Sequence, residues 1–261
     1  YIFLYIYTEF MNQKITETQY KEINLLYKNN NSSCKIAKLF NVTNTTILRI
    51  LKKNNIKIRS LSESQQKYYF NKNYFNKINT AEKAQVLGFI WGDGYIRQNK
   101  YVYGLAIGIH ERDFKYLEII KNCLESEHKI KIKNKLATFV ISNKILAEKL
   151  TQLGCMNNKS FIIKFPSEDV IPNHLIKFFI LGFFEANGCI TFCLDKMGYR
   201  HVNVNICSTY DVCSKILEFW HKIGYGGTLS CHKNGKNYIF SLGGAKQVNL
   251  FLKYIYENCS F

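Results

Sequence analysis

One short pattern occurs twice in this 261-residue chain, and it constrains the fold more than any other feature of the sequence. The first copy is residues 86–95, VLGFIWGDGY, and the second is residues 180–189, ILGFFEANGC. Their glycines Gly88 and Gly182 are 94 positions apart (182 − 88). Each copy ends an apolar run with a small residue, an Asp or Asn and a glycine, which is a helix-stop signal. The chain is therefore predicted to contain two related halves, each built around one buried helix.

Both glycines lie in the middle of the predicted helices, where glycine costs about 1 kcal/mol relative to alanine. A close approach of two helix backbones would offset this cost, because glycine has no Cβ. Thr80 and Pro172 are the helix-start signals of the two apolar runs. One copy alone would indicate an ordinary core helix, whereas two matched copies predict two helices that pack against each other.

These residues resemble the LAGLIDADG homing endonucleases in their single-chain form, which has two pseudo-symmetric halves. The resemblance covers residues 80–261. It implies a site-specific endonuclease, encoded in an intron, that binds a long asymmetric target of double-stranded DNA and hydrolyses phosphodiesters with a divalent metal. An RNA maturase that assists splicing of its host intron RNA is the alternative, since degenerate catalytic acids are compatible with that role.

The resemblance also assigns the metal site. In the family, the acid before the last glycine of each motif binds the metal, and these positions are Asp93 and Asn187 here. The main-chain carbonyls of Gly92 and Ala186 would add ligands. Mg²⁺ takes one or two carboxylates together with water and phosphate oxygens, and Mn²⁺ or Ca²⁺ are alternatives. Because an amide carries no charge, Asn187 predicts weak metal binding and an impaired or nicking enzyme. Either the natural protein is partly disabled or this copy was altered to hold DNA uncut.

Three further side chains bear on this site. Family members place a lysine at the entry to the last helix of each half, and Lys144 and Lys246 match those positions. Glu185 lies two positions before Asn187, and two residues on a helix point to different sides, so Glu185 is not expected to replace the missing acid. We therefore expect Asp93, Asn187, Lys144 and Lys246 to carry the catalysis.

Hydrophobic periodicity predicts the same order of elements, α-β-β-α-β-β-α, in residues 80–158 and in residues 172–261, with residues 159–171 as a connector. Residues 128–133 alternate strictly between lysine and a His or Ile side chain, which predicts a strand with a basic face. Asp113 is predicted to cap the helix over residues 114–124. The fold class is thus α+β, with two pseudo-symmetric subdomains joined at paired motif helices. The basic side chains expected to contact DNA from the two halves are Arg97, Lys129, Lys131, Lys133, Arg200 and Lys233.

Residues 15–60 are predicted to form a small all-α unit that resembles a helix-turn-helix of the resolvase or repressor type, with an ordinary helical hairpin as the alternative. The predicted helices run from residue 16 or 18 to about 28, over 33–40 and over 44–53. Ile23, Leu25 and Leu26 are expected on the apolar side of the first helix. In the third helix the outward side chains are expected to be Asn44, Thr45, Arg49 and Lys52. Residues 56–60 are predicted to form a basic extended arm in which Arg59 contacts DNA.

Two segments show no periodic pattern. Residues 61–79 are predicted to be a linker, and residues 1–14 a leader. The first ten residues are apolar but too short to cross a bilayer, and because Met11 follows them they are compatible with read-through from an upstream frame.

The amino-acid composition limits the classes of partner and the compartments that are compatible with this chain. The formal net charge is +17, which favours a polyanion, and nucleic acid is the expected partner. Nine cysteines without a Cys-x-x-Cys pair predict reduced thiols in an intracellular, reducing compartment. The abundance of Lys, Asn, Ile, Tyr and Phe indicates an A·T-rich coding sequence, as in a mitochondrion, a plastid or a virus. We expect a monomer that does not bind membranes.

Overall fold

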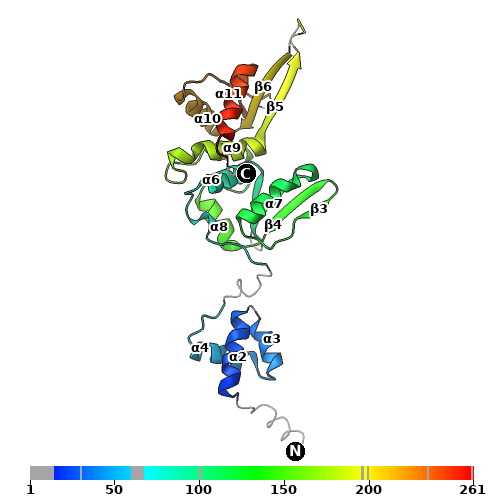
Figure 1. Ribbon diagram of the computed structural model, residues 1–261, viewed down its shortest axis with the longest axis vertical. Coiled ribbons are helices and arrows are strands. Elements are labelled where there is room, and N and C mark those ends of the chain that lie inside the picture. Colours follow the sequence, from blue (N-terminus) through cyan, green and yellow to red (C-terminus); the bar gives the residue numbers. More distant parts are fainter. Residues whose placement is uncertain are drawn as a thin grey trace, which may run out of the picture. The chain divides into compact units, whose positions relative to one another are not determined.

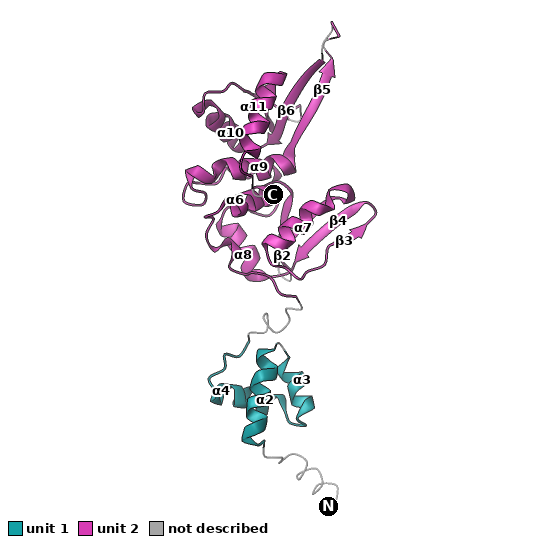
Figure 2. Cartoon of the chain, viewed as in Figure 1, with its two compact units in different colours: residues 1–67 teal, residues 68–261 magenta. Residues whose placement is uncertain are grey.

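The computed structural model describes residues 15–29, 31–59, 68–99, 102–194, 197–198, 200–233, 235–259 and 261. The chain divides into two compact units, residues 1–67 and residues 68–261 (Figures 1 and 2). The predicted leader, residues 1–14, lies outside the described residues, as do residues 60–67.

The described residues of the first unit form three helices, α2 (Glu17–Lys28), α3 (Ser33–Leu39) and α4 (Asn44–Lys53). Each begins at a hydroxyl side chain, Thr16, Ser32 or Thr43, that accepts a hydrogen bond from a backbone N–H three residues later. These bounds agree with the predicted helices to within one or two residues. The core of the unit consists of Ile23, Tyr27, Ile36, Ala37, Ile47, Ile50 and Leu51.

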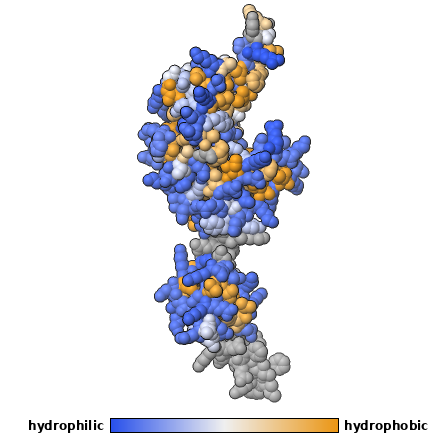
Figure 3. All heavy atoms as spheres, in the orientation of Figure 1, coloured by the Kyte–Doolittle hydropathy of each residue, from blue (hydrophilic) through white to orange (hydrophobic). Residues whose placement is uncertain are grey.

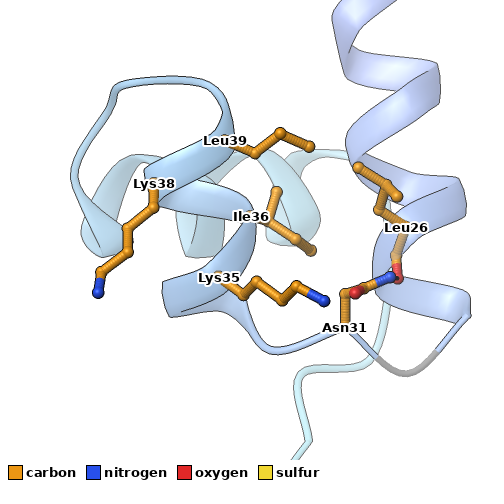
Figure 4. Close-up of a pocket in the computed structure, with 6 residues that line it drawn as sticks. All are labelled: Leu26, Asn31, Lys35, Ile36, Lys38 and Leu39. Atoms are coloured by element: carbon orange, nitrogen blue, oxygen red, sulfur yellow. Dashed lines mark hydrogen bonds between the residues drawn. The ribbon is translucent and has the colours of Figure 1, made fainter.

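One sequence-based expectation for α2 is wrong. Leu25 is 59% exposed, and Tyr27 instead joins Ile23 in the core, because these two positions share one side of the helix. Leu26 lines a pocket of about 320 Å³ together with Ile36 and Leu39, as Figure 4 shows. The apolar side of α2 thus consists of Ile23 and Leu26, as expected, together with Tyr27.

The predicted basic arm is folded against its own unit. The backbone N–H of Arg59 donates to the Tyr27 hydroxyl at 2.9 Å, and its guanidinium lies 4.1 Å from the centroid of that ring. The guanidinium also donates to the Asn31 carbonyl. Ile56 and Ile58 pack on the core of the unit. Arg59 is thus held on its own unit by a cation–π contact and hydrogen bonds.

The second unit repeats one arrangement twice, as predicted. Its first half contains α6 (Ala81–Asp93), β1 (Gly94–Gln98), β2 (Tyr103–His110), η2 (Glu111–Asp113), α7 (Phe114–Cys123), β3 (Lys131–Lys133), β4 (Leu136–Ile141) and α8 (Lys144–Gln152). The second half contains η4 (Asn173–Leu175), α9 (Ile176–Asn187), β5 (Gly188–Leu194), β6 (Arg200–Ser208), α10 (Tyr210–Lys222), β7 (Thr228–Cys231), β8 (Tyr238–Gly243) and α11 (Ala245–Tyr256). The connector holds η3 (Lys159–Phe161).

The two antiparallel sheets have matching strand orders, β1-β2-β4-β3 and β5-β6-β8-β7. Their registers also match, since Gly94 pairs with Ile107 and Gly188 pairs with Ile206. Alternate residues of each sheet, such as Leu105 and Ile107 in β2, are buried under helices. The other face of each sheet is not covered by helices, and we call it the outer face.

The motif helices α6 and α9 pack directly against each other at the centre of the unit, and Figure 1 shows them crossing there. A Cβ added to Gly88 would lie 2.1 Å from the carbonyl oxygen of Phe179. A Cβ added to Gly182 would lie 1.9 Å from the carbonyl oxygen of Gln85. The predicted reason for the mid-helix glycines is therefore observed, because the two backbones meet where neither residue has a side chain.

Three local expectations differ from the structure. The expected linker reaches residue 79, yet Phe70, Tyr74, Phe75 and Ile78 are buried in the core of the second unit. The side chain of Asp113 forms no capping bond because the turn η2 precedes α7 directly. The strand predicted over 128–133 is shorter than expected, because only its residues 131–133, which form β3, pair with β4. Among the described residues, no helix combines the length and apolarity needed to span a bilayer.

The helix crossing can be tested with single methyl groups. Gly88→Ala and Gly182→Ala should each lower the free energy of unfolding by at least about 2 kcal/mol. Overpacking against a partner backbone costs about 3 kcal/mol or more, and alanine recovers only about 1 kcal/mol of helix propensity. Gly226→Ala is the control, since no atom lies within 4 Å of a Cβ there. Urea denaturation measures all three, and equal stability of the first two variants and the control would contradict the close crossing.

Candidate active site

The two motif helices end side by side at a polar pocket of about 330 Å³. Asp93 is the last residue of α6 and Asn187 is the last residue of α9, and both line this pocket. Gly94 and Gly188 then turn the chain directly into β1 and β5. The other polar residues at the pocket are Lys159, Ser160, Ser208 and Asn237.

The helix ends are in van der Waals contact. A Cβ added to Gly92 would lie 2.3 Å from the Cβ of Ala186 and 3.4 Å from Oδ1 of Asn187. Gly92 therefore leaves room for the facing helix end, just as Gly88 does one turn earlier. The four residues that the sequence assigned to the metal site, Gly92, Asp93, Ala186 and Asn187, are thus brought together by the fold.

Lys159 contributes a positive charge that the sequence did not indicate. Its Nζ donates to the carbonyl oxygens of Ile90 at 2.7 Å and Gly92 at 2.6 Å, and also to that of Trp91. These carbonyls belong to the last turn of α6, where oxygens lack helical partners and the helix dipole favours a cation. Lys159 thereby closes the end of the helix that presents Asp93.

Burial shifts the pKa values of both charged groups in the pocket. It lowers the pKa of Lys159 to about 8, against the opposing effects of Cys155 and Asp93. It raises the pKa of Asp93, which the ammonium of Lys159 partly counteracts. Taking each charge out of water disfavours its ionised form, and the opposite charge nearby offsets part of that cost. Each of the two charges therefore offsets part of the desolvation cost of the other.

The role of Lys159 could not be predicted from the sequence, because the residues around it in the chain show no periodic pattern and no motif. It lies in the segment expected to be only a connector, 66 positions after Asp93 (159 − 93). One of 36 Lys and Arg residues carries no signal by itself. Only the return of the connector past the end of α6 reveals its role.

The two lysines expected from the family pattern lie elsewhere. Lys144 is exposed, forms an ion pair with Glu148 at 3.6 Å and lies 5.5 Å from the centroid of the Tyr103 ring. Lys246 is exposed on the first turn of α11. Neither lysine lines the pocket of Asp93.

Glu185 points away from Asn187. Its carboxylate accepts hydrogen bonds from Gln85 at 3.1 Å and from the hydroxyl of Tyr116. Burial raises the pKa of Glu185, and these two hydrogen bonds oppose the shift. Glu185 and Asp93 border a second hollow of about 640 Å³, which is also lined by residues of β2 and β5. Asp93 therefore faces a hollow on each side of the helix pair.

The basic residues expected to contact DNA divide between two faces. Arg97, Lys131 and Lys133 lie on the outer face of the first sheet, because Ile96 is buried and Ile132 pairs with the buried Ala137. Lys129 and Lys233 are exposed next to strands β3 and β7. Arg200 differs, since it has the same parity as the buried Val204 and so lies on the helix side of β6. Hydrophilic residues cover much of the visible surface of each unit (Figure 3).

The donor set at the helix ends has the chemistry that a hard divalent cation requires. Asp93 offers carboxylate oxygens, while Asn187 and the carbonyl of Ala186 offer neutral oxygens. The carbonyl of Gly92 already accepts from Lys159. Among the described residues there is no group of three or more His, Cys, Asp and Glu side chains that could hold a metal. A cation here would therefore need oxygens from water or substrate as well.

The sequence of the chain was compared with those of known families and proteins. No family model matches the chain. It is 28% identical over 210 residues to the uncharacterized protein MJ0314 of Methanocaldococcus jannaschii, covering 73% of this chain and 72% of that protein. It is also 35% identical over 102 residues to the reverse gyrase of the same organism, a match to 38% of this chain and only 6% of that protein.

Among solved structures, the LAGLIDADG homing endonuclease I-GzeII in complex with its DNA target superposes with a TM-score of 0.51. That match covers 68% of this chain and 84% of I-GzeII at 14% identity. A double mutant of I-SmaMI superposes with a TM-score of 0.50, over 68% of this chain and 84% of that one, also at 14% identity. The second unit therefore has the fold of the LAGLIDADG homing endonucleases, as its sequence predicted.

The capping role of Lys159 can be measured without any substrate. Lys159→Met keeps the length of the side chain but removes the donors to three carbonyls, so the free energy of unfolding should fall by at least about 2 kcal/mol. Lys144→Met, at an exposed lysine, should change it by no more than about 0.5 kcal/mol. Thermal or urea unfolding distinguishes the two variants. Equal stabilities would show that the ammonium does not close α6.

Proposed function

We propose that this protein is a site-specific endonuclease of double-stranded DNA. The observation that carries the proposal is the meeting of Asp93 and Asn187 at the ends of two packed helices, between two sheets with uncovered outer faces. I-GzeII, which shares the fold, is a homing endonuclease whose structure contains its DNA target. The sheets supply the surface for a duplex, and the helix ends supply the polar groups for phosphodiester hydrolysis.

The net charge of the chain and the alternation of side chains along its strands indicate that DNA binds on the outer faces of the two sheets. The net charge of +17 attracts a polyanion, and every second side chain of a strand on the outer face can reach a groove. The two halves share a backbone plan but differ in nearly every outer-face side chain, so the preferred target should be long and asymmetric. Since α6 and α9 of one chain already cover each other, we propose that a monomer binds it.

The chemistry requires a polar, partly desolvated site beside the scissile phosphate. Asp93 places an anionic oxygen there, and Lys159 holds the last turn of α6 in place and adds positive charge next to the substrate phosphates. Asp93, Asn187 and the carbonyl of Ala186 would hold Mg²⁺ or a similar divalent cation, which supplies activation of water and stabilisation of the leaving oxygen. Desolvation strengthens each of these charge interactions.

Asn187 limits the activity of the chain as written. The pocket contains one carboxylate at the helix ends where two are possible, and it already contains the ammonium of Lys159. Both features reduce the attraction for a second cation. We therefore propose that double-strand cleavage is slow and that the main product is nicked.

A charge-restoring substitution tests this account. Asn187→Asp adds an anionic ligand with almost no change in shape, so it should raise the rate of double-strand cleavage at least about tenfold in Mg²⁺. Adding Asp93→Asn to that variant should abolish cleavage while leaving affinity for the target largely intact, since affinity comes mainly from the basic sheets. Supercoiled plasmid containing a selected target separates nicked from linear product.

Three outcomes would contradict the proposal or one part of it. Rapid linearisation of the plasmid by the unmodified chain would show that Asn187 does not limit metal binding. Failure of Asn187→Asp to cut a tightly bound duplex would contradict endonuclease activity. Tenfold preference for host intron RNA over duplex DNA at matched salt would favour a maturase instead.

The first unit is proposed to extend the DNA contact. The side chains of Asn44, Thr45, Arg49 and Lys52 are exposed along one side of α4, opposite the buried Ile47, Ile50 and Leu51. This is the arrangement in which a recognition helix enters a major groove. Arg59 is not included in this surface, because it is bound to Tyr27 and Asn31.

Substitutions on α4 test this extension. Arg49→Ala together with Lys52→Ala should weaken target binding roughly five- to fiftyfold at moderate salt and reduce the slope of affinity against salt. Footprinting should show reduced protection at one end of the target only. Lys28→Ala with Lys38→Ala, at the ends of α2 and α3, is the charge-matched control. An unchanged footprint in the α4 variant would show that the first unit does not contact the DNA target through α4.

A further inference from the structure

The outer faces of the two sheets differ in chemistry at structurally equivalent positions. In the second sheet, Asn205 pairs with Cys189 on one side and with Ser241 on the other. The equivalent residue of the first sheet is Ala106, which pairs with Tyr95 and with Val140. An amide and a hydroxyl thus replace two apolar side chains at the centre of the outer face.

The amide of Asn205 is held at both of its polar atoms. The hydroxyl of Ser241 donates to Oδ1 of Asn205 at 2.7 Å. Nδ2 of Asn205 donates to the hydroxyl of Thr191 at 3.3 Å. Thr191 also lies on the outer face, because its neighbour Ile190 pairs with the buried Val204. Three strands, β5, β6 and β8, therefore fix one side chain.

Each polar atom of the amide can still form one more hydrogen bond. An amide oxygen has two lone pairs and an amide nitrogen two hydrogens, and one of each is used by Ser241 and Thr191. The half-buried Asn205 therefore presents one donor and one acceptor side by side away from the sheet. This pair matches the N7 acceptor and N6 donor of adenine in the major groove.

We propose that Asn205 is a base-reading residue that selects adenine in the half of the target facing the second sheet, and that Ser241 and Thr191 are its positioning residues. The inference rests on the proposed binding of duplex DNA. In the structure Ser241 donates to Oδ1 and Thr191 accepts from Nδ2, and these two bonds hold the plane of the amide and its orientation. The equivalent Ala106 and Val140 offer no such donor–acceptor pair, so the selection belongs to one half of the target only.

The test selects bound duplexes from a random pool with the full chain and Ca²⁺. The unmodified protein should enrich one strongly preferred adenine in the half-site of the second sheet. Asn205→Ala should reduce discrimination at that position roughly 5- to 150-fold, the range for loss of a bidentate base contact, and leave other positions unchanged. Asn249→Ala is the matched control, since Asn249 is exposed on α11, on the helix side of the sheet.

A positioning role gives a distinct result. Ser241→Ala should reduce discrimination at the same position while affinity for an unrelated duplex stays constant. Ser241→Thr retains the hydroxyl and should restore the preference for adenine. Similar loss in both Ser241 variants would show that the hydroxyl does not orient the amide, and would overturn this part of the proposal.

Failure of this inference differs from failure of the proposed function. If the unmodified chain enriches no sequence, binding to a specific duplex is excluded and both proposals fall. If it enriches a target whose adenine preference survives Asn205→Ala, only the role of Asn205 falls. If Asn205→Ala weakens the binding of every duplex by the same factor, base reading is likewise excluded, because such a loss indicates a contact to the phosphate backbone.

Discussion

The contact between the backbones of α6 and α9 determines where every other part of the second unit lies. At Gly88 and Gly182 the facing helix is so near that a methyl group would overlap a carbonyl oxygen. This distance brings the helix ends together, and it places the two sheets on either side of the helix pair. A larger separation would still bury apolar side chains, but it would move Asp93 and Asn187 apart. The glycines thus cost helix propensity and define the geometry of the pocket.

The charges in the pocket follow from the same crossing. Two helix C-termini side by side concentrate unpaired carbonyl oxygens and negative dipole ends in one place. In α6 this is balanced by Lys159, which donates to three of those carbonyls. In α9 the terminal side chain is the neutral Asn187 rather than an acid, so less negative charge must be balanced there. An internal ammonium thus balances the end of α6, whereas α9 ends in a neutral amide.

The sequence predicted those features that depend on local patterns. Doubled motifs, capping residues and strand periodicity located the paired helices, both sheets and the helices of the first unit. It could not predict features that depend on how distant segments meet. Lys159 reaches the pocket because the connector returns past α6, and Arg59 folds onto Tyr27 through a contact between segments 32 residues apart. The burial of Phe70 and Phe75 likewise depends on the core of the first half, which the unpatterned segment around them does not reveal.

The pseudo-symmetry of the two halves is retained or lost according to what each position contacts. It is nearly complete where backbones pack, since both glycines, both strand orders and both strand registers are repeated. It is absent where side chains face outwards, where Ala106 and Val140 of one sheet correspond to Asn205 and Ser241 of the other. Packing constrains shape, and a duplicated fold must keep that shape in both copies. The outer faces have no internal partner to constrain them, so they can diverge to fit a ligand whose two halves differ.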